Sequence, residues 1–337
     1  MTYVTVIHGM ANKPPYAELK ALWADSLART DPPRGSNPTG GNPGIDLGML
    51  GVGYDMTYWA DVLYAEPERT DAAGQEATDR GMIEGRSLRT TAKRRPADRR
   101  WRKQVKTAQG KDLVAQLESI YAPRFDGFVT VDPKTKRRRK AKERGLREEL
   151  RLPEFIQKPL MEELLRDVHH YLYNVGHQPR PGGPTFQVRD ELQRRFVSVV
   201  KAGATKGVPH VVVSHSMGTI IAYDCLRNVA ECPEIDVLIT LGSPLGLDPV
   251  QDKLKPKGAK GVDFPPKVKG AWINVYDPLD PVVGFDPKFA NDYKRNGQKA
   301  VLDIAESNWG KWRHDIVKYL RGPRLRAQLK LALGVSS

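Results

Sequence analysis

The sequence has 337 residues, with 54 Lys and Arg against 40 Asp and Glu, a formal net charge of +14 and a pI near 9.6. An apolar fraction of 39% excludes a wholly disordered chain, and no stretch approaches the roughly 20 apolar residues of a membrane-spanning helix. The excess charge lies entirely within residues 80–151, which hold 23 Lys and Arg and nine Asp and Glu. The rest of the chain is neutral, so the charge belongs to one segment and not to the whole protein.

The beginning of the chain and its cysteines predict a cytoplasmic protein. An apolar run, Tyr3–Ile7, comes almost at once, without a basic leader or a small-residue cleavage site before it. Cys225 and Cys232 are too few for a disulfide framework. We therefore expect no secretion signal and a reducing compartment.

Strands and helices alternate along the neutral part of the chain. In order, we expect a strand at residues 4–7, a helix at 19–27, a strand at 52–57, helices at 160–173 and 188–200, a strand at 210–214, a helix at 218–228, strands at 237–241, 271–276 and 300–304, and helices at 314–320 and 323–333. The continuous run Val211-Val212-Val213 is typical of a parallel strand that is buried on both faces. This order predicts an α/β fold with a mostly parallel sheet flanked by helices.

Residues 213–218, with the sequence V-S-H-S-M-G, carry the strongest chemical signal. An apolar strand ends here and a helix follows directly, so Ser216 would lie on a sharp strand-to-helix turn. The small residues Ser214 and Gly218 flank it at the two positions where strand and helix cross closely. This is the pattern of a nucleophile elbow, G-x-S-x-G, with Ser214 in place of the first glycine. Such a turn directs the next N–H, that of Met217, toward a developing oxyanion.

With this elbow the sequence resembles the α/β-hydrolase superfamily, and within it bacterial lipase-like serine esterases with an S/G-H-S-M-G elbow. The resemblance covers about residues 1–65 and 186–320. Residues 6–10, V-I-H-G-M, resemble the strand end whose following N–H, here that of Met10, completes the oxyanion hole. Residues 239–245, I-T-L-G-S-P-L, and 272–282, W-I-N-V-Y-D-P-L-D-P-V, resemble the segments after the next two strands. The resemblance implies an α/β-hydrolase core at 1–65 and 186–337, with a sheet shortened at its N-terminal side.

The superfamily order of nucleophile, acid and histidine implies the other members of a catalytic triad. Asp280 and Asp277 both follow the strand at 271–276; the resemblance favours Asp280 and leaves Asp277 as the alternative, or as a turn cap. His314 is the histidine that follows the acid in the chain. The resemblance also implies residues of a substrate pocket: His8, Gly9, His215 and Trp59. Ordinary packing is the alternative for Trp59.

These residue types suit nucleophilic catalysis of ester hydrolysis. A serine hydroxyl does not ionise at neutral pH, whereas an imidazole, with an ordinary pKa of about 6.5, can take its proton and return it to the leaving group. The implied reaction is hydrolysis of a carboxylic ester through an acyl-enzyme, without a metal or organic cofactor. The alternatives are a thioesterase or phospholipase acting on anionic substrates, an acyl transferase, and a non-catalytic binding protein of the same fold. We do not expect a metal site from Asp167, His169 and His170.

Residues 66–185, called the insert below, separate the two parts of the expected core. In the superfamily, insertions between framework strands build the cap over the active site, and the resemblance implies that role here. The densest basic runs of the chain are at residues 93–95, 99–103 and 136–142. Apolar residues at helical spacing predict that part of the insert folds as a helix: Leu113, Val114, Leu117, Ile120 and Tyr121.

The basic charge of the insert has three interpretations. It could form a solvated face without a specific partner, attract an anionic membrane surface or an anionic substrate such as a phospholipid or an acyl-CoA, or bind nucleic acid. Nucleic acid is the least expected partner, because Trp101 alone among aromatic residues lies within the basic runs. We expect a small-molecule or lipid ester as the substrate.

Overall fold

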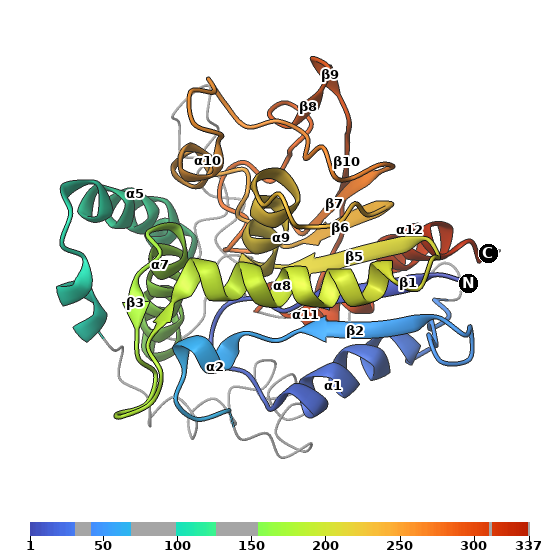
Figure 1. The fold of residues 1–337 in the computed structure, drawn as a ribbon, viewed down its shortest axis with the longest axis horizontal. Helices are drawn as coiled ribbons and strands as arrows, with labels where there is room; N and C mark the ends of the chain where they lie inside the picture. The colour runs from blue at the N-terminus through green and yellow to red at the C-terminus, as the bar shows by residue number, and fades with distance from the viewer. Residues whose placement is uncertain (31–41, 69–98, 126–153, 310–311, 336–337) are drawn as a thin grey trace, which may run out of the picture.

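Six parallel strands form the centre of the computed structural model, which describes residues 1–30, 42–68, 99–125, 154–309 and 312–335 (Figure 1). The strand order is β10-β7-β6-β5-β1-β2, and each neighbouring pair is parallel. The strands are β1 (Tyr3–Ile7), β2 (Gly53–Thr57), β5 (His210–His215), β6 (Val237–Leu241), β7 (Trp272–Tyr276) and β10 (Val301–Ala305). The α/β class and the mostly parallel sheet are thereby confirmed.

Helices cover both faces of the sheet, because its central strands are apolar on both sides. Val211 and Val213 of β5 pack into one core, and Val212 between them packs into the other. The first core contains residues of three helices: α1 (Tyr16–Ala28), α11 (Ile316–Leu320) and α12 (Pro323–Leu333). The second contains residues of α8 (Val188–Ala204), α9 (Met217–Asn228) and α10 (Asp248–Leu254). A short helix, α2 (Ala60–Leu63), follows β2.

Most expected elements agree with the structure within a few residues, but the expected helix at 314–320 begins later. Asp315 is the N-cap residue, and its Oδ1 accepts a hydrogen bond from the Val317 N–H at 2.9 Å. A side-chain acceptor of this kind satisfies a helix-start donor and fixes the boundary. His314 therefore lies in the loop before α11, and not in the first turn of a helix.

The described part of the insert is built around two helices that lie beyond the carboxyl ends of β1, β2 and β5 (Figure 1). They are α5 (Ala108–Phe125) and α7 (Glu154–Leu172), and a 3-10 helix, η1 (Arg100–Gln104), precedes them. The expected apolar stripe of α5 is buried, except for the half-buried Ile120. Two antiparallel hairpins complete the described elements: β3 (Gly176–His177) with β4 (Phe186–Gln187) after α7, and β8 (Lys294–Arg295) with β9 (Gln298–Lys299) before β10.

One of the three basic runs is partly paired with carboxylates within the protein. Arg102 pairs with Glu162 of α7 at 2.9 Å and with Glu118 of α5 at 3.2 Å, and Arg99 also reaches Glu162 at 2.9 Å. Trp101 is buried between them and donates to the same Glu162 at 3.2 Å. This run therefore ties the insert together, and Trp101 is not available to stack on a nucleotide base. The runs at 93–95 and 136–142 lie outside the described residues.

Neither cysteine is exposed to solvent. Cys225 and Cys232 are free thiols, both buried, and burial raises the pKa of Cys232 to about 12. Within the described residues, none of the helices is long and apolar enough to cross a membrane.

Candidate active site

Ser216 lies between the end of β5 and the start of α9, in a backbone conformation that side-chain-bearing residues rarely adopt. Its φ is 54° and its ψ is −129°. The Ser216 N–H donates to Leu241 O at 2.9 Å, and Thr219 Oγ1 donates to Ser216 O at 2.6 Å. A Cβ on Gly218 would lie 2.5 Å from His8 O, so glycine is required where the helix passes the neighbouring strand. The strand-turn-helix geometry expected of an elbow is present.

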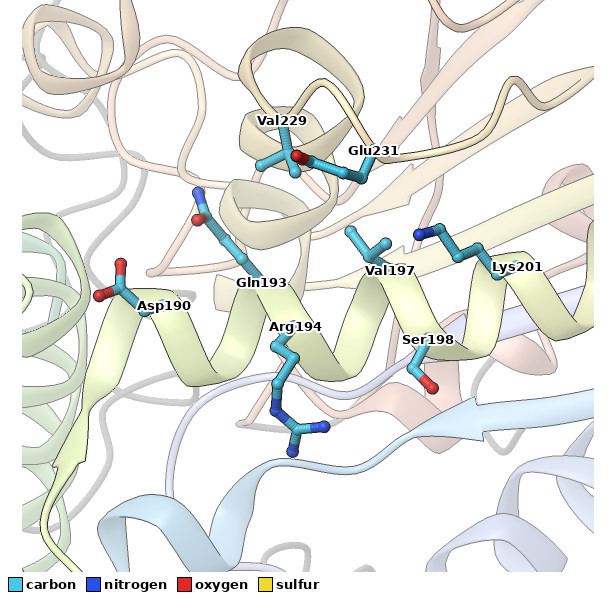
Figure 2. Close-up of a pocket in the computed structure, with 8 residues that line it drawn as sticks. All are labelled: Asp190, Gln193, Arg194, Val197, Ser198, Lys201, Val229 and Glu231. Carbon is cyan, nitrogen blue, oxygen red and sulfur yellow. The ribbon is translucent and has the colours of Figure 1, made fainter.

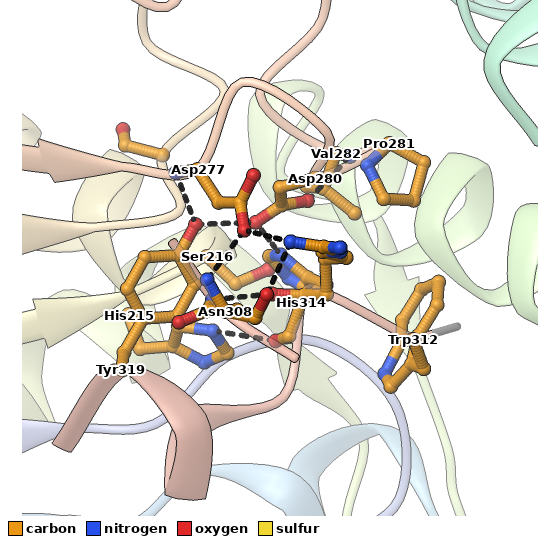
Figure 3. A network of polar contacts seen from close by, with 12 residues as sticks. His215, Ser216, Asp277, Asp280, Pro281, Val282, Asn308, Trp312, His314 and Tyr319 are labelled. Carbon is orange, nitrogen blue, oxygen red and sulfur yellow. Dashed lines mark hydrogen bonds and ion pairs between the residues drawn. The ribbon is translucent and has the colours of Figure 1, made fainter. Parts of the chain in front are cut away.

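His314 and Asp280 meet near this serine, although they come from different loops (Figure 3). His314 Nδ1 lies 2.8 Å from Asp280 Oδ2, and both side chains are buried. A carboxylate can only accept hydrogen bonds, so Nδ1 carries the proton and Nε2 is left as the basic nitrogen. Asp280 Oδ1 accepts the Val282 N–H at 2.8 Å, which fixes the carboxylate within its own turn.

Asp277, the alternative acid, has a different set of partners. Its Oδ1 accepts the Leu279 N–H at 2.7 Å, and its Oδ2 accepts the Asn308 N–H at 2.7 Å. Arg313 Nη1 lies 3.3 Å from the same Oδ2. Burial is the main cause that raises the pKa of Asp277. Asp277 therefore braces the loops on either side of the site, and Asp280 is the carboxylate that contacts His314.

The serine hydroxyl and the distal imidazole nitrogen form no hydrogen bond with each other or with any other described residue. Ser216 Oγ and His314 Nε2 are buried, and neither has a hydrogen-bond partner among the described residues. Ser216 is fully buried and His314 is 3% exposed, so both side chains are shielded from solvent. Trp312 packs edge-on against His314 at 5.6 Å between ring centroids, and Phe125 of α5 packs on Trp312 at 6.0 Å. Aromatic side chains therefore form part of the surroundings of the imidazole.

The two expected oxyanion donors flank the serine. Met217 is the first residue of α9, where a backbone N–H has no partner within the helix. Gly9 lies directly against the serine on the other side, since a Cβ there would be 2.5 Å from Ser216 Cβ. This closeness follows from the register of the sheet, in which Ile7 of β1 lies opposite Ser214 of β5. Met10 comes directly after this contact and is buried.

His8 and Trp59, two of the residues implied for a substrate pocket, bind each other. The Trp59 N–H donates to His8 Nε2 at 3.0 Å, and Trp59 Nε1 donates to His8 O at 3.1 Å. The rings stack at 4.6 Å between centroids, and both residues are buried. Burial is the main cause that lowers the pKa of His8 well below its ordinary value, so its imidazole is neutral. The pair locks the end of β1 to the segment after β2.

His215, the residue before the nucleophile, supports the loop that carries His314. Its Nε2 lies 3.0 Å from His314 O, and the two rings stack at 4.6 Å between centroids. Burial, and then the nearby His314, lower the pKa of His215 well below its ordinary value. A neutral His215 can therefore donate to that carbonyl without adding charge beside the imidazole of His314. Whether these pocket residues contact a substrate stays a prediction.

Two further residues hold the Asp280–His314 pair and were not anticipated. Tyr319 of α11 donates to Asp280 Oδ2 at 2.7 Å. Gly242, which follows β6 and has a φ of +53°, comes so close that a Cβ would lie 2.8 Å from Asp280 Oδ2. Gly242 lies in the segment compared with the superfamily, but no local pattern marks Tyr319, which is 39 residues from Asp280.

A hollow of about 510 Å³ lies elsewhere, along α8 (Figure 2). Its walls are formed mainly by polar and charged side chains of that helix and by the segment after α9: Asp190, Gln193, Arg194, Val197, Ser198, Lys201, Val229 and Glu231. It contains none of the residues that surround Ser216. We find no chemistry in it that would act on a substrate.

The side chains of the histidine-rich turn of α7 are paired with other groups. Asp167 accepts hydrogen bonds from the Ala11 N–H and the Tyr64 hydroxyl, both at 3.0 Å, and His169 and His170 face each other with their Nδ1 atoms 3.4 Å apart. Among the described residues there is no group of three or more side chains of the types that could hold a metal ion.

Comparison of the sequence with protein-family models gives no match, and no curated protein matches it. The chemistry of the site therefore has to be inferred from its own geometry.

Proposed function

We propose that this protein is a serine hydrolase of the α/β-hydrolase fold, in which the insert forms a cap and Ser216, His314 and Asp280 form a triad. The observation that carries the proposal is that Ser216 Oγ, on a strained turn, and His314 Nε2 are both buried without a hydrogen-bond partner among the described residues. Asp280 at the same time orients the imidazole from its other nitrogen. Strained backbone and unpartnered polar atoms are destabilising, and they concentrate at sites where chemistry requires them.

The reaction follows from these positions. His314 Nε2 takes the hydroxyl proton while Ser216 Oγ bonds to the carbonyl carbon of an ester, and the same proton then passes to the departing alcohol as its C–O bond breaks. Water attacks the acyl-enzyme by the same route, releases the carboxylic acid and restores the serine. The Met10 and Met217 N–H groups bind the oxyanion, with a loss of roughly 3 kcal/mol expected for each donor removed.

Apolar residues beside the imidazole favour an ester with a hydrophobic acyl part. Trp312 and Phe125 form a continuous aromatic surface next to His314. A charged or strongly hydrated group placed there would lose its solvation without a partner in return. Buried free thiols accord with the reducing cytoplasm as the place of action.

Covalent labelling with a fluorophosphonate tests the proposal. The wild type should be labelled and should hydrolyse p-nitrophenyl esters, and Ser216→Ala should do neither while it keeps its unfolding temperature. Ser26→Ala is a matched control, because Ser26 is a buried serine of α1 that donates to Leu22 O. Labelling that persists in Ser216→Ala, or a wild type without labelling and turnover, would refute the assignment. A series of esters and thioesters of increasing acyl length would then define the substrate.

A further inference from the structure

We propose that the insert is part of the catalytic architecture: α5 positions the acid loop through Arg124, and α7 positions the oxyanion segment through Asp167. The inference rests on the proposed hydrolase function and assigns two positioning residues to it. Neither side chain touches the reacting atoms; each holds the backbone of a loop that does.

Arg124, near the end of α5, binds the turn that carries Asp280. Its Nη2 donates to Asp280 O at 2.6 Å and to Pro278 O at 3.3 Å, and its Nε donates to Pro281 O at 3.2 Å. One turn earlier in the helix, the Tyr121 hydroxyl donates to Val282 O at 3.2 Å. Two side chains of the insert thus hold four carbonyl groups between residues 278 and 282.

The position of the Asp280 carboxylate depends on this turn. Its Oδ1 accepts the Val282 N–H, so side chain and turn are joined, and a movement of the turn would move Oδ2 away from His314. The fork of a guanidinium can bind several carbonyls at once, whereas a lysine ammonium acts as a point charge without that fixed geometry.

Among the described residues, Arg124 has no carboxylate partner, which a buried arginine usually has. It is 9% exposed, and no carboxylate lies within ion-pair distance of it in the described part of the chain. Burial lowers the pKa of Arg124, and the charge of Asp280 opposes that effect. A buried cation held by carbonyls and by the face of the Phe285 ring, without a carboxylate among the described residues, is an unfavourable choice for packing alone.

Asp167 performs the corresponding task on the other side of the serine. Its Oδ2 accepts the Ala11 N–H at 3.0 Å, and its Oδ1 is held by Arg166 at 2.7 Å. Ala11 directly follows Met10 and has a φ of 67°, which is unfavourable for a residue with a side chain. A fully buried carboxylate therefore holds a strained backbone next to the proposed oxyanion donor.

Substitutions at Arg124 and Asp167 have different expected results, and these distinguish a positioning role from a role in packing alone. Arg124→Met should lower kcat on a p-nitrophenyl ester on the order of tenfold to a hundredfold with little change in KM, because a displaced acid loop misorients the base. The far-downfield proton resonance of the His314–Asp280 hydrogen bond should be lost or shifted. Asp167→Asn should also lower kcat and the rate of fluorophosphonate labelling, but should retain that resonance.

Arg102→Met is the matched control. Arg102 is another arginine of the insert and it links Glu118 of α5 to Glu162 of α7, but it touches neither loop. Its loss should lower the unfolding temperature and leave kcat and the downfield resonance unchanged. Arg124→Lys keeps the charge with fewer carbonyl contacts and should fall between wild type and Arg124→Met.

Failure of this inference differs from failure of the proposed function. A wild type that is neither labelled nor active would refute both the proposed function and this inference. A labelled wild type with an equally active Arg124→Met that keeps the resonance would overturn the positioning role alone, as would equal losses of kcat in Arg124→Met and Arg102→Met. If Arg124→Met does not fold, Arg124→Lys decides: unchanged kcat, or loss of the fold in that variant also, would overturn the proposal.

Discussion

The Tyr319 hydroxyl lies 2.7 Å from Asp280 Oδ2, the same oxygen that lies 2.8 Å from His314 Nδ1. The Asp277 N–H donates to this hydroxyl at 3.0 Å, so the proton of Tyr319 points to the carboxylate. Burial raises the pKa of Tyr319 well above its ordinary value, which keeps the phenol neutral. Tyr319 is therefore a fixed donor that stabilises the charge of Asp280 and limits its rotation.

Replacement of Tyr319 by Phe should lower kcat by about tenfold to a hundredfold, since one hydrogen bond to a buried charge contributes roughly 1.5–3 kcal/mol. The matched control is Tyr171→Phe. Tyr171 is also fully buried and donates to a buried carboxylate, Asp224 Oδ2, at 2.7 Å, but it lies on α7 away from the triad. Ester hydrolysis and thermal unfolding should be measured for both. Equal losses of activity in the two variants would contradict a specific role for Tyr319.

The two aspartates of the acid loop should separate activity from stability. Asp280→Asn leaves the volume unchanged but removes the acceptor that fixes the His314 tautomer, and kcat should fall by about 10⁴-fold. Asp277→Asn should leave kcat close to that of the wild type and lower the free energy of unfolding by about 1–3 kcal/mol, because its carboxylate binds two N–H groups and Arg313. Denaturant unfolding and ester turnover of both variants test this, and the reverse pattern would make Asp277 the acid.

The sequence predicts the framework well because the framework depends on local patterns. Apolar runs mark β5 and β6, and the small residues around Ser216 mark the turn between β5 and α9. The start of α11 was expected at His314, because apolar periodicity does not reveal that the Asp315 side chain caps the helix. Helix boundaries of this kind are set by single hydrogen bonds.

The residues that support the site could not be predicted, because they act across long separations in the chain. Arg124 reaches Asp280 from 156 positions away, and Asp167 reaches Ala11 from the same separation. Trp101 lies among basic residues, and only the fold shows that the side chain is buried on Glu162. Contacts of this kind depend on how α5 and α7 lie beyond the sheet, which composition and periodicity do not specify.

Gly242→Ala tests whether activity requires the close approach of the backbone to the Asp280–His314 pair. A Cβ at this position would lie 2.8 Å from Asp280 Oδ2 and 3.1 Å from His314 Nδ1, so Gly242→Ala should abolish most of the ester turnover. The variant also places a side chain at a φ of +53°, which destabilises the backbone by about 1–2 kcal/mol. Gly207→Ala is the control, since Gly207 has a φ of +63° and nothing within 4 Å of a new Cβ. Thermal unfolding should show a loss of stability in both variants, larger for Gly242→Ala because of its added close contacts, and only Gly242→Ala should lose activity.

Buried histidines should make the protein sensitive to mild acid. Burial lowers the pKa of His169 and His210 to about 4 and that of His170 to about 3, whereas the unfolded chain binds these protons near its ordinary pKa of about 6.5. Below that pH the unfolded state takes up protons that the folded state does not. The free energy of unfolding should therefore fall as the pH drops from about 6.5 toward 4, by roughly 1–2 kcal/mol per histidine at about pH 5.

The contribution of a single group can be isolated with His170→Leu. His170 Nε2 has no hydrogen-bond partner among the described residues, so an apolar side chain of similar size removes the titration without breaking a bond from that atom. Thermal unfolding between about pH 7.5 and pH 5 should show a smaller decrease for His170→Leu than for the wild type. Parallel curves for the two proteins would mean that His170 does not stay neutral in the folded state, and that the acid sensitivity arises elsewhere.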